Sequence, residues 1–514
     1  MTTAVAYRAE SAAHVSVTAR VATGAGLSLV TTGMLILAFP PFNIWPLGFI
    51  CLVPMLLAQY RVMPNNWTAL AKILGIDLWV LWFVTLLFGL NPQTWFLQMI
   101  PVAVAALDLA TGKATRRFHE QTNYRWFVLE GIASWVGFEM IRRWIPLVRT
   151  HGLIGHTLHT QPWLIQPVSI FGVYGLSLLV VLVNHALAQG AITLFDRRWV
   201  WGETPTIEAR DSRRWLAIAG GVLAGWIVLS LVLLATAPAG AATVRVAAVQ
   251  SGYRTPGTWD DEPELARFDA LVAQTRAAAA QGAQLVVWPE LSIGFDPQVE
   301  HTEELRALAA ESNAHLVIGY GSKTEYRNAA VLLTPVGEFL AISGKSHIPP
   351  GEGVDPDGGV YPIYNTALGR FGALICHDAN FTDSARILVG KGAQLLTVST
   401  LETFIPGFEK MFYVQTLFRA LENRVPTVKA DVAFSSAIAD PYGRVLAKRS
   451  GAPEGEAFAL VADVPLGAGR TIFNRLGDWT GWISLVGMAF FTFYPSVLDR
   501  RERARRAADA APQE

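Results

Sequence analysis

The sequence predicts a multi-pass α-helical membrane bundle joined to a soluble α/β domain. Only 16% of the 514 residues are charged, against ~25% in soluble domains. Residues 245–470 hold most of the charge and alternate short β-branched runs with Ala-rich helical patterns. Elsewhere, long stretches contain no Asp, Glu, Lys or Arg, namely residues 21–60, 78–107, 152–195, 215–244 and 479–498.

The uncharged stretches predict transmembrane helices. A helix needs ~20 apolar residues to cross a bilayer, and its backbone groups must bond internally. Two of the runs are divided where Pro or Asn interrupts them, at Pro40-Pro41 and at Asn91-Pro92. This division gives about eight expected spans, near residues 22–39, 44–60, 68–90, 95–111, 125–144, 164–194, 215–236 and 480–497.

The expected organisation has three parts. Residues 1–243 form a transmembrane bundle, residues 244–470 a soluble domain, and residues 471–514 a last helix with a basic tail. Basic residues gather between spans four and five, between spans six and seven, and after the last span. The positive-inside rule places these clusters and both chain ends in the cytoplasm. The soluble domain is therefore predicted on the extracytoplasmic face.

Composition excludes several classes of function. Lys+Arg and Asp+Glu are equal at 41 each, so no basic surface favours nucleic acid as a partner. With Cys51 and Cys376 as the two cysteines, neither a disulfide framework nor a cysteine-based zinc site is expected. His151, His156 and His159 lie close in sequence but have no converging carboxylate or cysteine. We expect no metal and no organic cofactor.

The soluble domain contains continuous apolar runs that are typical of buried strands. Helical patterns separate the runs, which predicts sheets covered by helices. Glu290 closes one run, Lys345 follows another, and Cys376 ends a third. Strand ends are where α/β proteins usually build their sites. The runs are Val244–Gln250, Leu285–Glu290, His315–Gly321, Ala329–Pro335, Glu338–Ser343, Phe371–Asp378 and Leu395–Thr400.

These three residues form a candidate catalytic set. A thiolate nucleophile needs a base or a nearby positive charge. Glu290 could take the proton of the Cys376 thiol, and Lys345 could stabilise both the thiolate and an oxyanion. Taken singly, each residue has an ordinary structural explanation, such as a small buried hydrophobe for the cysteine. The three together are a far more specific pattern than any one of them.

With these motifs in order, residues 244–467 resemble the nitrilase superfamily. Glu290 lies in VVWPE, Lys345 in a Gly-Lys element and Cys376 in GALICHD. The resemblance implies a Glu-Lys-Cys triad on an αββα sandwich. The membrane part also resembles the apolipoprotein N-acyltransferase family, which places a nitrilase-like domain between the last two of eight spans. The segments that carry this second resemblance are Leu37–Leu57, Ser169–Asn184 and Thr471–Trp479.

The resemblance implies a phospholipid-dependent acyl transfer in the bacterial inner membrane. An acyl chain would pass through a Cys376 thioester to the N-terminal amine of a lipid-modified cysteine on an apolipoprotein, with Glu290 handling the proton in both steps. It also implies supporting roles for Trp259 in GTWD and for Glu352 in PPGEG. We therefore expect a phospholipid donor and a diacylglyceryl-modified acceptor as partners.

The chain departs from the family pattern in two places. The family usually continues the nucleophile with Tyr-Glu, where this chain has His377-Asp378. Asp378 keeps the carboxylate, one methylene shorter, and His377 keeps a polar aromatic ring. The Asn- and Asp-containing segment that follows the next strand in the family is replaced by Val398–Phe404. These departures bear on the acceptor or the acyl donor, not on the Glu-Lys-Cys chemistry.

Two other functions remain open at this point. A membrane-anchored amidase would pass the acyl group to water, and the triad alone does not separate hydrolysis from transfer. The large membrane part favours transfer, because a hydrolase of small amides would need at most one anchor. A transporter or scaffold with an inactive soluble domain is the third reading. The intact triad and the lack of a paired inverted repeat disfavour it.

Overall fold

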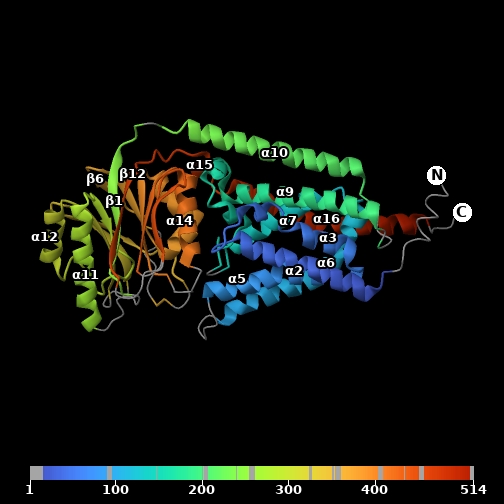
Figure 1. Cartoon of the computed structure of the whole chain (residues 1–514), viewed down its shortest axis with the longest axis horizontal. Helices are drawn as coiled ribbons and strands as arrows, with labels where there is room; N and C mark the ends of the chain where they lie inside the picture. Colours follow the sequence, from blue (N-terminus) through green and yellow to red (C-terminus); the bar gives the residue numbers. More distant parts are fainter. Residues whose placement is uncertain are drawn as a thin grey trace. The chain divides into compact units, whose positions relative to one another are not determined.

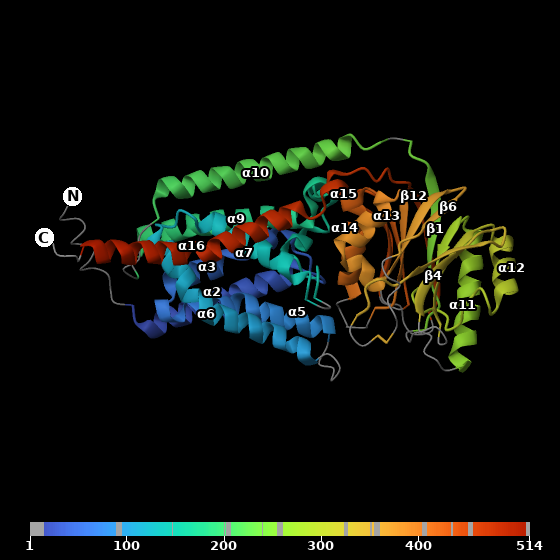
Figure 2. The same ribbon diagram turned by 180° about the vertical axis from the view of Figure 1, so that it is seen from behind.

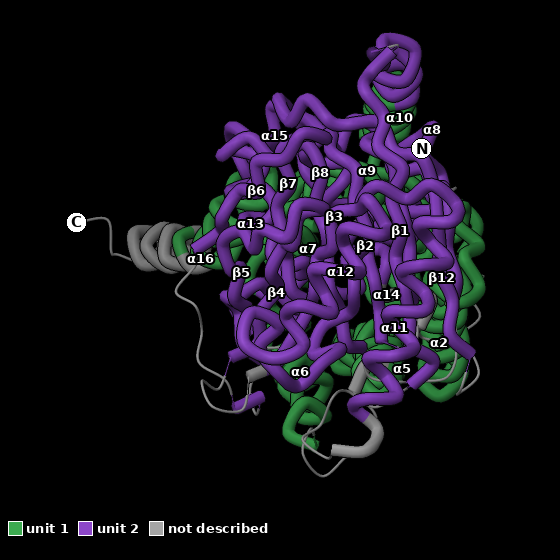
Figure 3. The backbone as a smooth tube through the Cα atoms, turned by 90° about the vertical axis from the view of Figure 1, so that its left-hand side faces the viewer, with its two compact units in different colours: residues 1–141, 174–226, 480–514 green, residues 142–173, 227–479 purple. Residues whose placement is uncertain are grey.

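The chain forms two compact units in a computed structural model (Figure 3). Residues 1–141, 174–226 and 480–514 make up the first, which we call the membrane unit, and residues 142–173 and 227–479 make up the second, the sheet unit. The division at residues 243 and 470 stays a prediction. The structure describes residues 15–88, 95–145, 148–199, 201, 207–238, 240–253, 261–322, 327–349, 352–353, 360–402, 409–432, 435–450 and 456–509.

The membrane unit is built from apolar helices that lie side by side (Figures 1 and 2). Among the described residues, six segments are long and apolar enough to cross a bilayer. The two other expected spans correspond to α7 (Phe127–Arg142) and α16 (Trp479–Asp509). The prediction of a multi-pass helical bundle is confirmed. The six segments are Val17–Ala38 (α2), Trp45–Val62, Asn65–Leu86, Trp95–Gln121, Val168–Arg198 (α9) and Ala209–Ala235 (α10).

Shorter helices lie within some of these segments. They are α3 (Val53–Leu57), α4 (Thr68–Lys72), α5 (Leu78–Phe88) and α6 (Met99–Gln121). Helix α9 contains one non-helical residue, Gly172, with a φ of 67°. A Cβ at this position would meet the Phe473 ring at 2.9 Å, so the turn requires glycine for both conformation and space.

The sheet unit contains two six-stranded sheets, in the orders β12-β1-β2-β3-β4-β5 and β11-β10-β9-β8-β7-β6. Strands β1, β2 and β3 run parallel, as do β7, β8 and β9, while the outer pairings are antiparallel. The strands are β1 (Thr243–Gln250), β2 (Leu285–Val287), β3 (His315–Ser322), β4 (Arg327–Leu333), β5 (Phe339–Gly344), β6 (Ile363–Thr366), β7 (Gly369–Ile375), β8 (Leu395–Thr400), β9 (Thr427–Asp431), β10 (Ser435–Ala439), β11 (Val445–Ser450) and β12 (Phe458–Pro465).

Both faces of each sheet are covered, which explains the continuous apolar strands. In β1, Ala247 and Val249 pack into the cluster that includes the helices α11 and α12, whereas Val246 and Ala248 face the other sheet. Figure 1 shows α11 and α12 on one side of the two sheets and α14 on the other. The αββα sandwich is therefore confirmed. Its helices are α11 (Asp261–Ala280), α12 (Thr302–Ser312), α13 (Thr382–Gly390), α14 (Glu409–Asn423) and α15 (Ile472–Leu476).

The sheet unit also includes residues 142–173, which run from the end of the fifth predicted span into the start of the sixth. Within residues 142–173, the Thr150 hydroxyl donates to the carbonyl of Asn380 at 2.8 Å. The Arg424 guanidinium donates to the Gln166 side chain at 2.5 Å and to its carbonyl at 3.2 Å. These bonds join the segment to the turn after β7 and to the end of α14.

We predict that Gly319→Ala, in β3, lowers the free energy of unfolding by about 1–3 kcal/mol, the usual cost of overpacking. An added Cβ would stand 2.1 Å from the Pro289 carbonyl oxygen and 3.1 Å from Glu290 Cα, and backbone atoms cannot turn aside. Thermal unfolding of the detergent-solubilised protein measures the effect. Gly390→Ala is the matched control, since the atom nearest its Cβ is Asn474 Oδ1 at 3.9 Å. Equal melting temperatures in the two variants would contradict the prediction.

Candidate active site

Glu290 follows β2 as the third residue of a rigid extension. The Trp288 backbone N–H donates to the Val317 carbonyl at 2.8 Å, and the Ser399 hydroxyl donates to the Trp288 carbonyl at 2.8 Å. The indole of Trp288 is itself buried and donates to Thr275 at 2.9 Å. Glu290 is 2% exposed. These bonds fix the position of the backbone that leads to Glu290.

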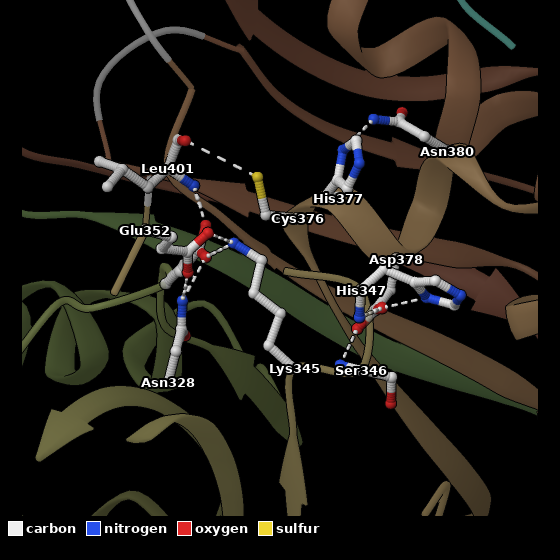
Figure 4. A network of polar contacts seen from close by, with 11 residues as sticks. Asn328, Lys345, Ser346, His347, Glu352, Cys376, His377, Asp378, Asn380 and Leu401 are labelled. Atoms are coloured by element: carbon white, nitrogen blue, oxygen red, sulfur yellow. Dashed lines mark hydrogen bonds and ion pairs between the residues drawn. The ribbon is translucent and has the colours of Figure 1, made fainter. Parts of the chain in front are cut away.

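Lys345 follows β5 and reaches two carboxylates. Its Nζ lies 2.8 Å from Glu290 Oε1 and 2.6 Å from Glu352 Oε2 (Figure 4). Burial alone would lower the pKa of Lys345, but Glu290, Cys376 and Glu352 outweigh it and raise that pKa above its ordinary value. The ammonium group therefore stays charged, which suits it to stabilise negative charge rather than to accept a proton.

Asn328 links the two carboxylates and was not foreseen from the sequence. Its Nδ2 donates to Glu290 Oε1 and to Glu352 Oε1, each at 2.7 Å. The pKa of Glu352 is raised, mainly by burial and also by Glu290, while Lys345 opposes the shift. Two carboxyl groups thus share one ammonium and one amide, and Glu352 is suited to hold a proton.

Cys376 lies directly after β7, as the first residue of a short 3-10 helix (Cys376–Asn380). Its φ is 42°, in the left-handed region that non-glycine residues rarely adopt. Burial raises the pKa of the thiol well above its ordinary value; Glu290 and Glu402 add to the rise and Lys345 opposes it. The resting group is therefore a thiol, and it needs a base to become a nucleophile.

Leu401, the residue after β8, contacts both reactive side chains through its backbone. Its N–H donates to Glu290 Oε2 at 2.7 Å, and its carbonyl oxygen lies 3.7 Å from Cys376 Sγ. Figure 4 shows the sulfur and the Lys345 ammonium converging on the same space. The structure thus brings the predicted base, cation and nucleophile together at the ends of β2, β5 and β7. Their catalytic assignment stays a prediction.

Two family descriptions match this chain. Residues 31–186 match the apolipoprotein N-acyltransferase N-terminal domain, and residues 245–472 match the carbon-nitrogen hydrolase family. The apolipoprotein N-acyltransferase of Geobacter metallireducens is 29% identical over 90% of this chain and 94% of its own length. That of Gloeobacter violaceus is 24% identical over 86% and 88%. The chain belongs to the apolipoprotein N-acyltransferase family.

Part of this chain also resembles solved structures. An amidase from Nesterenkonia sp. is 24% identical, with 44% of this chain and 92% of the amidase covered and a TM-score of 0.37.

Asp378, two residues after Cys376, forms contacts with the residues that follow Lys345. It is 1% exposed, and its carboxylate accepts from the backbone N–H of His347 at 2.9 Å and of Ser346 at 3.3 Å. The His347 ring lies 2.7 Å from the same carboxylate and stacks on Phe381 at 3.5 Å. Asp378 therefore ties the nucleophile turn to the residues that follow Lys345, a structural role within the site.

His377 is neutral at physiological pH. Burial first, and then nearby positive groups beginning with His151, lower the pKa of His377 to about 3. Asn380 Nδ2 donates to its Nδ1 at 3.0 Å. His377 is thus unsuited to general acid–base work near pH 7. Trp259, the remaining supporting residue expected from the resemblance, lies outside the described residues.

The direction of the pKa shift of Cys376 allows a test of whether the charge of Glu290 acts on the thiol. Because Glu290 raises the pKa of Cys376, Glu290→Gln should lower it, and the midpoint of Cys376 alkylation should move to lower pH. Acyl transfer should fall in the same variant. Iodoacetamide labelling followed by mass spectrometry, in a Cys51→Ala background, measures the midpoint. A midpoint that moves to higher pH would show that Glu290 does not act on the thiol as a charge.

Proposed function

We propose that this protein is a phospholipid-dependent N-acyltransferase that modifies the N-terminal amine of a lipid-modified cysteine on apolipoproteins. It is an acyltransferase of the apolipoprotein N-acyltransferase family and a bacterial membrane protein. The contact network of Glu290, Lys345, Glu352 and Cys376 supports the proposal most directly. No metal or organic cofactor is part of the proposal.

In the first step, Glu290 takes the proton of the Cys376 thiol and the sulfur attacks an ester carbonyl of a phospholipid. The S–C bond forms, an oxyanion develops, and Lys345 stabilises it. The ester C–O bond then breaks. Glu290 returns the proton to the leaving alkoxide, and a lysophospholipid departs from the thioester.

In the second step, a neutral amine attacks the thioester. The N–C bond forms and the S–C bond breaks, while the amine proton passes through Glu290 to the thiolate. Glu352 orients Lys345 in both steps, as its 2.6 Å contact supports. Since the two substrates use one cysteine in turn, the kinetics should be of the ping-pong type.

The membrane part has a physical purpose in this reaction. Each buried acyl methylene is worth about 0.8 kcal/mol, so moving two long chains into water would be prohibitive. An anchored enzyme can act on the ester at headgroup level while the chains stay in lipid.

We further propose that the chain is divided into residues 1–243, 244–470 and 471–514. Residues 244–470 would lie on the extracytoplasmic face, as the distribution of basic residues supports.

We predict that Cys376→Ala and Glu290→Gln each reduce acyl transfer by at least about 10²-fold, because one removes the nucleophile and the other the base. A lipopeptide acceptor and a defined phospholipid measure the activity. Cys51→Ala is the control and should be active. Full activity in folded Cys376→Ala would remove the proposed nucleophile.

Phospholipid alone should add one acyl mass to Cys376, because the thioester forms before the acceptor binds. Hydroxylamine should remove that mass. Intact-mass spectrometry before and after addition of a lipopeptide amine follows both half-reactions. Release of free fatty acid without transfer to the amine would favour the alternative function, an amidase that passes the acyl group to water.

The proposed topology gives its own expectation. A protease added to intact spheroplasts should cleave within residues 244–470, whereas the basic tail after residue 500 should be protected until the membrane is opened. Immunoblotting with tags at the C-terminus reads out both regions. Cleavage of the sheet unit only after the membrane is opened would invert the proposed orientation.

A further inference from the structure

A second buried charge cluster lies at the ends of β8 and β9 and has no part in the mechanism above. It consists of Glu402, Lys429 and Asp431, whose side chains are 9%, 1% and 0% exposed. Lys429 Nζ lies 3.1 Å from Glu402 Oε2 and 3.2 Å from Asp431 Oδ2, and it donates to the Ser435 carbonyl at 2.5 Å. Buried charges are costly unless they are paired, and here both carboxylates lie against the same ammonium group.

The cluster shares a sheet edge with the nucleophile. Strands β7, β8 and β9 are parallel neighbours, with Ile375 paired to Ser399 and Thr400 paired to Asp431. Because carboxyl ends of parallel strands meet at one edge, Cys376 and the cluster emerge on the same side. Glu402 belongs to Val398–Phe404, the segment in which this chain departs from the family pattern.

Leu401 is the point where the cluster and the catalytic groups meet. Its N–H contacts Glu290 and its carbonyl contacts the Cys376 thiol. The residues on either side of it are both anchored. The Thr400 hydroxyl donates to Asp431 Oδ2 at 2.6 Å, and Glu402 forms its ion pair with Lys429.

We propose that Lys429 is a positioning residue that, through Glu402 and Asp431, holds the Leu401 backbone against both the base and the nucleophile. The inference rests on the proposed function, since it gives Glu290 and Cys376 their roles. The contacts of Lys429 are with Glu402, Asp431 and the Ser435 carbonyl. Lys429 affects the reaction by orienting the Leu401 N–H toward Glu290 and the Leu401 carbonyl toward the Cys376 thiol.

The cluster also acts on the thiol through charge. The charged groups that face the thiol are Glu290 from the end of β2, Lys345 after β5 and Glu402 after β8. Burial raises the pKa of the thiol most, and Glu402 adds to the rise. The pKa of Glu402 is also raised, by burial and then by Asp431 against the opposing effect of Lys429. Because Lys429 lowers the pKa of Glu402, loss of the Lys429 charge would favour the protonated form of Glu402 and remove its contribution to the thiol pKa.

The experiment compares Lys429→Met with Lys429→Arg in the full-length, detergent-solubilised Cys51→Ala protein. Lys429→Met should move the midpoint of Cys376 alkylation by iodoacetamide downward by about one pH unit, because Glu402 loses the cation that favours its ionised form. It should also slow Cys376 acylation by phospholipid about tenfold. Lys429→Arg keeps the charge and should restore both quantities. Lys391→Met, which removes an exposed lysine of the same unit, should change neither.

A second variant keeps the test decisive if Lys429→Met fails to fold. Thr400→Val removes the hydroxyl that donates to Asp431 and leaves every charge in place. It should slow acylation several-fold with the alkylation midpoint unchanged, and Thr400→Ser should recover the rate. Wild-type rates and midpoints in folded Lys429→Met or Thr400→Val would overturn the proposal. So would a loss in Lys429→Met that leaves the midpoint unmoved.

Failure of the proposed function gives a different result. If the wild-type protein forms no acyl-cysteine with phospholipid, the acyltransfer mechanism fails. Alkylation by iodoacetamide requires no lipid, so its midpoint in the Lys429 variants still decides whether the cluster acts on the thiol.

Discussion

The site depends on one buried ammonium group shared by two carboxyl groups. Lys345 lies between Glu290 and Glu352, and Asn328 donates to both acids on the other side. Breaking a buried pair by removing one partner typically costs about 3–5 kcal/mol, because the other charge is left uncompensated. The network is thus rigid, and its rigidity gives Glu290 a fixed direction relative to the residues that carry the thiol.

The nucleophile turn shows how an unfavourable conformation is maintained. Cys376 has a φ of 42°, which an L-residue adopts at some cost. The turn is held from both ends, by β7 before it and by the bonds of Asp378 to the backbone after Lys345. The Thr150 hydroxyl adds a third anchor at the Asn380 carbonyl. These contacts direct the sulfur away from the strand and into the site.

The sequence predicted the parts of this structure that have a local signature. Apolar runs identified β1 to β5, β7 and β8 but not β6 or β9 to β12. Residues at strand ends identified Glu290, Lys345 and Cys376. Asn328 and Leu401 escaped prediction because their contacts join positions 38 and 111 residues apart. Leu401 acts through its backbone, which carries no side-chain signal at all. The use of Asp378 also escaped, since sequence adjacency to Cys376 says nothing of the direction in which a carboxylate points.

The contacts of Glu290 limit how many groups this base can serve at once. An ionised carboxylate offers about four acceptor positions. The amide of Asn328, the ammonium of Lys345 and the N–H of Leu401 occupy three of them among the described residues. One position remains, so the base serves a single proton-bearing group at a time. An amine is intrinsically the better nucleophile toward a thioester, and a lipid-modified acceptor is concentrated in the bilayer while a soluble one is not. A single free acceptor position would serve an amine or a water equally, so the preference for transfer comes from the nucleophilicity and the bilayer concentration of the acceptor.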